Sequence, residues 1–159
     1  MAPADDRPAY DWTASPLADS VSVSSLGAAN GLLPFTAVLP STSSPTALYV
    51  TNPATTPKDQ LELAAVYNDP KFGPFQLFEQ PVGMTEGGLE AWASNCNTCT
   101  TQQLASIGDR HILILASPGH GVSFSWLKGE LLETVIGPDE TFSRGSGLAV
   151  ASNMITQGG

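Results

Sequence analysis

Short apolar segments separated by clusters of Pro, Gly, Ser and Thr constrain the fold of this chain more than any other feature of its sequence. The apolar run at 112–116 has the length of a strand, and a Pro-Gly-His-Gly turn sequence follows it at 118–121. A transmembrane helix needs about 18–20 consecutive apolar residues. The pattern therefore predicts strands joined by turns, and no direct membrane insertion of this segment.

Seven segments have the composition of β-strands, and some of them also alternate as strands do. Residues 60–68 show this well, because Leu61, Leu63, Ala65 and Tyr67 alternate with other residues and would share one face. The third and fourth strands are expected to form a hairpin, and the last three to form a meander. The predicted strands are 35–39, 47–51, 60–68, 75–80, 109–117, 122–127 and 130–136.

Two helices are expected, one near each end of the strand series. Ser24 or Ser25 can cap a short first helix, which Pro34 ends. Thr141 or Ser143 can cap a final helix. The apolar and small residues at helical spacing are Leu26, Ala29, Leu32 and Leu33 in the first helix, and Leu148, Ala149, Ser152 and Ile155 along the last.

This order of elements predicts an α+β fold: a single curved antiparallel β-sheet of about seven strands, with a short N-terminal helix and a C-terminal helix packed on it. Residues 1–21 contain three Pro and four Asp and little periodicity, which predicts a flexible N-terminal arm. Residues 22–156 are expected to form a single α+β domain. Residues 81–104 are predicted to be a long polar, Gly-rich loop within it.

The charge of the chain restricts its partners. Its 159 residues include 6 Lys and Arg against 15 Asp and Glu, a net charge of −9, so a nucleic-acid partner is excluded. Only 13% of residues are charged, and the polar surface comes instead from Ser, Thr, Asn, Gln, Gly and Pro, which favours an extracytoplasmic location. Because the first residues lack the features of a signal peptide, we expect a leader or membrane anchor upstream of residue 1.

The motif Cys96-Asn97-Thr98-Cys99 is the sharpest local feature. We favour a structural disulfide between Cys96 and Cys99, with free thiols, a metal site and a redox pair as the alternatives. A zinc site would need His111 and His120 as further ligands, and nine residues of predicted strand separate them by about 30 Å. A redox pair would need a helix N-terminus in a βαβ unit, which the pattern does not predict.

No residue is assigned to catalysis, to a cofactor or to a metal. The chain has no Gly-x-Ser-x-Gly motif, so a hydrolase is the third hypothesis only. All carboxylates are expected on the solvated surface. Phe124 and Trp126 alternate on one strand and are expected in the core, whereas Trp92, in the polar loop, is the predicted interaction residue.

Two stretches resemble a known family. Residues 22–40 read SVSSLGAANGLLPFTAVLP, and residues 122–154 read VSFSWLKGELLETVIGPDETFSRGSGLAVASNM. Both are similar to a bacterial domain of unknown function, found as the extracytoplasmic C-terminal domain of transmembrane anti-sigma factors and related envelope proteins. Between them, LELAAVYND, FQLFEQ and the turn at 107–110 match the family's hairpin and small turn. The cysteine-bearing loop and the Ser/Pro sequence near residue 43 depart from its pattern.

The resemblance implies packing and turns but no catalytic residues. It implies a non-enzymatic extracytoplasmic sensor or protein-interaction domain, either anchored through a segment outside this sequence or secreted. The alternative is a secreted or lipid-anchored domain that binds a small apolar ligand. The expected partner is thus a protein or a small ligand of the cell envelope, with no cofactor.

Overall fold

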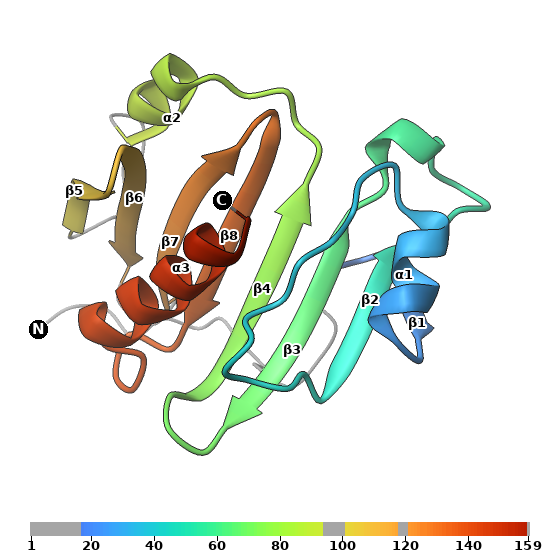
Figure 1. Ribbon diagram of the computed structural model, residues 1–159, viewed down its shortest axis with the longest axis horizontal. Helices are drawn as coiled ribbons and strands as arrows, with labels where there is room; N and C mark the ends of the chain where they lie inside the picture. The colour runs from blue at the N-terminus through green and yellow to red at the C-terminus, as the bar shows by residue number, and fades with distance from the viewer. Residues whose placement is uncertain (1–16, 94–100, 118–120, 159) are drawn as a thin grey trace, which may run out of the picture.

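Eight strands form one antiparallel sheet in the computed structural model, which describes residues 17–93, 101–117 and 121–158 (Figure 1). Their spatial order is β1-β2-β3-β4-β8-β7-β6-β5. Their bounds are β1 Ser20–Val23, β2 Ala47–Thr51, β3 Leu63–Asp69, β4 Gly73–Gln80, β5 Thr101–Ile107, β6 Arg110–Ser117, β7 Gly121–Lys128 and β8 Leu131–Gly137. The α+β fold with a single antiparallel sheet is confirmed.

The helices are α1 (Leu26–Leu32), α2 (Glu86–Ala93), α3 (Arg144–Gly158) and the 3₁₀ turn η1 (Lys58–Gln60). Ser25 caps α1, because its Oγ accepts a hydrogen bond of 3.1 Å from the backbone N–H of Ala28. Ser143 caps α3 in the same way, accepting from the N–H of Ser146 at 3.1 Å. Each cap is one of the two serine or threonine positions predicted for that helix.

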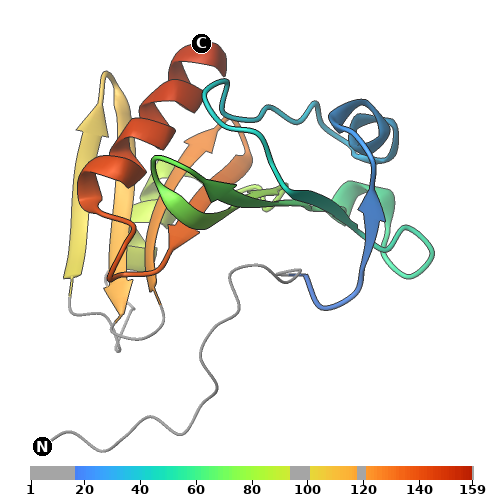
Figure 2. The same cartoon turned by 90° about the horizontal axis from the view of Figure 1, so that it is seen from below.

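The two faces of the sheet are covered differently. α1, α3 and the segment after α1 lie on one face, which we call the α3 face (Figure 2). α2 packs on the other face, where its Leu89 contacts Leu113, Leu127 and Leu132. The larger apolar cluster belongs to the α3 face and contains Tyr67, Phe75, Phe124 and Trp126, as the alternation on their strands predicts.

α3 lies on the sheet through a stripe of small and apolar residues. Gly147, Val150, Ala151 and Met154 are buried, at the i, i+3, i+4, i+7 spacing of one helix face. Of the residues predicted along this helix, Leu148 and Ile155 pack partly against the core, whereas Ala149 is exposed. The two faces of this Gly- and Ser-rich helix differ little in hydrophobicity. Its sequence alone therefore does not show which face is buried.

Three predictions about elements were wrong. Residues 35–39 do not form a strand, because their backbone bonds to side chains instead of to a neighbouring strand. Two strands were missed: β1, which is short, and β5, whose sequence TQQLASI is largely polar. The predicted loop at 81–104 contains α2 and the first residues of β5. Gly87 and Gly88 weaken the helical signal, and burial of Leu89 compensates for it.

The boundary of the folded unit also differs slightly from the prediction. β1 includes Ser20 and Val21, two residues of the predicted N-terminal arm. Residues 1–16 of that arm lie outside the described residues.

Candidate functional site

Residues 33–40, which we call the strap, cross the α3 face of the sheet after α1 without forming a helix or a strand (Figure 1). Two side chains bind its backbone in the middle. The N–H of Ala37 donates to Oδ1 of Asn30 in α1 at 2.7 Å, and the N–H of Val38 donates to Oε1 of Glu79 in β4 at 3.0 Å. The strap is therefore attached to the sheet by a carboxyl group, and not by a strand ladder.

The far end of the strap, and Ser41 directly after it, are held by α3. Asn153 accepts from the N–H of Ser41 at 2.8 Å and donates from Nδ2 to the Ser41 hydroxyl at 2.9 Å. Nε2 of Gln157 donates to the carbonyl of Leu39 at 3.1 Å. These contacts lie on the exposed side of the helix, where water competes for the same groups.

Glu79 and Glu133 face each other beneath the strap. They are directly opposite in the pairing of β4 with β8, so their side chains share the α3 face. Leu63 and Trp126 flank them in the same row of the sheet. Glu79 is 0% exposed and Glu133 is 3% exposed. The expectation that all carboxylates lie on the solvated surface was therefore wrong for these two.

The signal that could have found this pair is the alternation of the strands. Glu79 shares its parity with the buried Phe75 and Leu77 in β4, and Glu133 shares its parity with Val135 in β8. Each glutamate thus occupies a core position of its strand. That the two meet is decided by the register between β4 and β8, which two separate segments of sequence do not specify.

Burial changes the acidity of both carboxyl groups. It raises the pKa of Glu79 to about 8, and the charge of Glu133 adds to the rise. The Val38 N–H and Lys128 oppose that rise. Burial likewise raises the pKa of Glu133 to about 7, against the charges of Lys128 and Arg110. The pair therefore retains protons at neutral pH that exposed carboxyl groups would have released.

Two buried oxygens in this region have no hydrogen-bond partner among the described residues: Oε2 of Glu79 and the hydroxyl of Tyr67. The Tyr67 ring stacks on Phe75 with 4.5 Å between the ring centroids. Burial and the charge of Glu79 raise the pKa of Tyr67, which keeps this hydroxyl neutral. Both oxygens thus remain in the core without the hydrogen bonds that usually compensate for burial.

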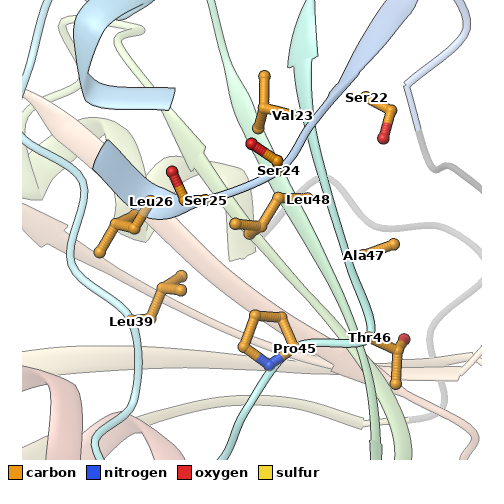
Figure 3. Close-up of a pocket in the computed structure, with 10 residues that line it drawn as sticks. All are labelled: Ser22, Val23, Ser24, Ser25, Leu26, Leu39, Pro45, Thr46, Ala47 and Leu48. Atoms are coloured by element: carbon orange, nitrogen blue, oxygen red, sulfur yellow. The ribbon is translucent and has the colours of Figure 1, made fainter. Parts of the chain in front are cut away.

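Two surface grooves flank the strap. Leu39 lines the first, of about 470 Å³, in which Leu26 and Leu39 come from separate segments and Pro45 lies near them (Figure 3). Phe35 lines the second, of about 500 Å³, together with Lys128. The other residues of the first groove are Ser22, Val23, Ser24, Ser25, Thr46, Ala47 and Leu48, and those of the second are Asp59, Pro81, Val82, Gly83, Glu130 and Leu131.

This arrangement suits proton uptake better than catalysis on a substrate. The two carboxyl groups are closed to solvent, so a substrate cannot reach them while the strap is in place. One residue of the strap lines each groove, and Lys128 belongs both to the second groove and to the surroundings of the pair. A displacement of the strap would alter both grooves at once.

The residues singled out in the sequence lie elsewhere. Trp92 is in α2, and not in a loop. Cys96, Cys99 and His120 lie outside the described residues, so the disulfide stays a prediction. His111 is on β6, with Nδ1 3.5 Å from Oε2 of Glu86 and 3.9 Å from Oε1 of Glu90, all partly exposed.

In the described part of the chain, no group of three or more His, Cys, Asp or Glu side chains is placed to hold a metal ion. None of the helices in the same residues is both long enough and apolar enough to span a membrane.

Comparisons with protein-family models, with curated proteins and with solved structures found no match for this chain. The resemblance to the outer domain of anti-sigma factors therefore stays a prediction.

Proposed function

We propose that this chain is a non-enzymatic sensor or protein-interaction domain of the bacterial cell envelope, in which the Glu79–Glu133 pair responds to protons and controls the position of the strap. The observation that supports it best is the hydrogen bond from the Val38 N–H to a carboxyl group that is itself buried against a second one. The low content of charged residues and the resemblance of residues 22–154 support the envelope location.

The direction of the response follows from electrostatics. A protonated pair is compatible with burial, whereas two ionised carboxylates side by side repel each other and lack hydration. Water reaches Glu79 when the strap moves away from it, so ionisation favours the open arrangement. Rising pH is therefore expected to release the strap, and falling pH to close it.

The surroundings of the pair contain few opposing charges. Lys128 of β7 and Arg110 of β6 attract the ionised form, and Tyr67 of β3 is neutral. The strap and α1 contain no ionisable side chain, and the buried stripe of α3 is apolar. The protonation of Glu79 and Glu133 thus decides the balance between the closed and the open position of the strap.

Hydrogen exchange of the strap tests this proposal. We expect the amide of Val38 to exchange faster at about pH 9 than at about pH 6, after correction for intrinsic rates, relative to amides in β3 and β4. In the double variant Glu79→Gln, Glu133→Gln, the strap should lose this dependence on pH. A matched control is Glu140→Gln, which changes an exposed carboxylate in the turn before α3 and outside both grooves.

An unchanged exchange rate across this pH range in the wild-type chain would refute the role of the pair. A pH dependence that persists in the double glutamine variant would refute it as well. The sequence of the complete gene tests the rest of the proposal. A cytoplasmic helical segment and one membrane helix upstream would support the sensor, whereas a signal peptide alone would support a secreted protein.

The second candidate is a binding domain for a small apolar ligand. The groove of Figure 3 favours it, because Leu26, Leu39, Leu48 and Pro45 line it. A fluorescent fatty acid is a suitable probe. Saturable binding that Leu39→Asp abolishes and Val82→Asp, in the second groove, leaves intact would favour this candidate over the sensor.

A further inference from the structure

The outer edge of β5 is the longer of the two edges of the sheet that the described residues form. In that sheet β5 is the terminal strand and pairs with β6 alone. The opposite edge is β1, which has 4 residues, whereas β5 has 7. An edge strand presents backbone N–H and C=O groups to any chain that can pair with them.

β5 lacks the features that usually protect such an edge. Its sequence TQQLASI contains no charged residue and no proline. Its pairing with β6 runs one to one from Thr101 to Ile107, so no bulge twists the strand away. α2 contacts β5, and within the described residues no strand pairs with the outer edge of β5.

The turn between β5 and β6 determines which backbone groups point outward. Gly108 and Asp109 form a two-residue turn with φ of +60° at Gly108, so Ile107 and Arg110 exchange the closing hydrogen bonds. Hydrogen-bonded and non-hydrogen-bonded pairs alternate from there. The outward-pointing N–H and C=O groups are consequently those of Ser106, Leu104 and Gln102.

We propose that the edge of β5 pairs with the same edge of a second copy of this chain. Leu104 is the middle residue of β5, so an antiparallel pairing about a two-fold axis places Leu104 opposite its own counterpart and Gln102 opposite Ser106 of the second copy. The outward groups of the two strands then bond to one another.

Charge and exposure favour a second copy as the occupant. The chain has a net charge of −9, and a contact between two identical acidic surfaces would be repulsive at most places. Along β5 no charge meets a like charge, because the strand has none. Leu104 is 41% exposed, one of two large apolar side chains so exposed in the described residues, and the pairing would bury it against its counterpart.

The interface is expected to be small. Edge pairing of two strands of this length buries less area than the roughly 1,200 Å² of a stable complex, so the dimer should be weak and depend on concentration. Sedimentation of the full chain from about 1 µM to about 500 µM should show a monomer–dimer equilibrium. A monomer throughout this range would overturn the proposal.

Leu104→Lys tests the location, because it places two like charges opposite each other at the two-fold axis. We expect the dimer dissociation constant to rise at least about tenfold. Val82→Lys is the matched control, since Val82 is the other exposed large apolar residue, at 48%, and lies outside the sheet. It should leave association unchanged. Equal association of wild type and folded Leu104→Lys would refute pairing through β5.

Amide exchange measured by NMR provides a readout that does not depend on a variant. Raising the concentration should slow exchange at the outward amides of Gln102, Leu104 and Ser106, and should leave the inward amides of Gln103 and Ala105 unchanged. A dimer whose formation protects none of the three outward amides would also overturn the proposal. These tests do not involve the strap or the glutamate pair, so they succeed or fail independently of the proposed sensor function.

Discussion

A Cβ atom on Gly147 would lie 2.1 Å from the nearest ring atom of Phe124, which is far closer than two such atoms can approach. Gly147 belongs to the buried stripe of α3, and Phe124 lies in β7 beneath it. The absence of a side chain at this one position therefore determines how closely the helix packs on the sheet.

Gly147→Ala should destabilise the fold, because the added methyl group must displace either the helix or the buried ring. We expect the free energy of unfolding to fall by about 1–3 kcal/mol, measured by urea denaturation. Gly31→Ala is the control: Gly31 is exposed in α1, and its added Cβ would meet no atom within 4 Å. That change should stabilise the chain by about 0.5–1 kcal/mol. If Gly147→Ala left the free energy of unfolding unchanged, the close packing of α3 on Phe124 would be contradicted.

The stability of the chain should decline from mildly acidic to alkaline pH. Burial raises the carboxyl pKa of Glu79 to about 8 and that of Glu133 to about 7, both above the ordinary 4.5, so the folded chain holds protons that the unfolded chain releases. The stabilisation from these protons is complete below about pH 4.5 and is lost as the pH rises through 7 and 8.

Glu79→Gln should remove much of this decline. The amide keeps the shape of the side chain and its acceptor for the Val38 N–H, but it cannot ionise. At about pH 9 we expect a gain of on the order of 1–3 kcal/mol in the free energy of unfolding, and at about pH 5 a much smaller change. Thermal denaturation at a series of pH values measures it. If Glu79→Gln were less stable than the wild type at high pH, Glu79 would be ionised in the folded chain and its charge stabilised by its surroundings.

Asn153→Ala should loosen the end of the strap without unfolding the sheet. The change removes both hydrogen bonds between Asn153 and Ser41, so amides at 39–41 should exchange faster. Because these groups are exposed, global stability should fall by only about 1 kcal/mol. Thr156→Ala serves as the control, since the Thr156 hydroxyl donates to the carbonyls of Ser152 and Asn153 in its own helix. Equal exchange in the two variants would show that Asn153 does not anchor the strap.

Tyr67→Phe should stabilise the chain, or at least leave it unchanged. The substitution removes a buried hydroxyl that has no partner within the described residues and keeps the ring that stacks on Phe75. We expect a gain of about 1 kcal/mol in the free energy of unfolding. Tyr49→Phe, at a partly exposed position in β2, should change stability by less than about 0.5 kcal/mol. Destabilisation by Tyr67→Phe would reveal a partner for the hydroxyl.

The sequence predicted the fold class because that information is local. Alternation in 60–68 correctly placed Leu61, Leu63, Ala65 and Tyr67 on one buried face. Caps correctly located the start of both predicted helices, and Pro34 the end of the first, within a few residues. The strand predicted at 35–39 failed for a non-local reason: Asn30 and Glu79 provide the acceptors that a neighbouring strand would otherwise supply.

The candidate site could not be predicted from local sequence either, because it too forms from segments that are distant in the chain. Glu79 and Glu133 are 54 positions apart in the numbering, and each is an ordinary carboxylate when considered alone. The sequence by itself determined an acidic chain with few charges, whose short apolar segments and turns form one antiparallel sheet with a helix near each end. The tertiary structure decided that β4 and β8 are neighbours, and thereby buried two carboxyl groups side by side under the strap. Burial and proximity set their acidity, and both depend on contacts between segments that the chain brings together only on folding.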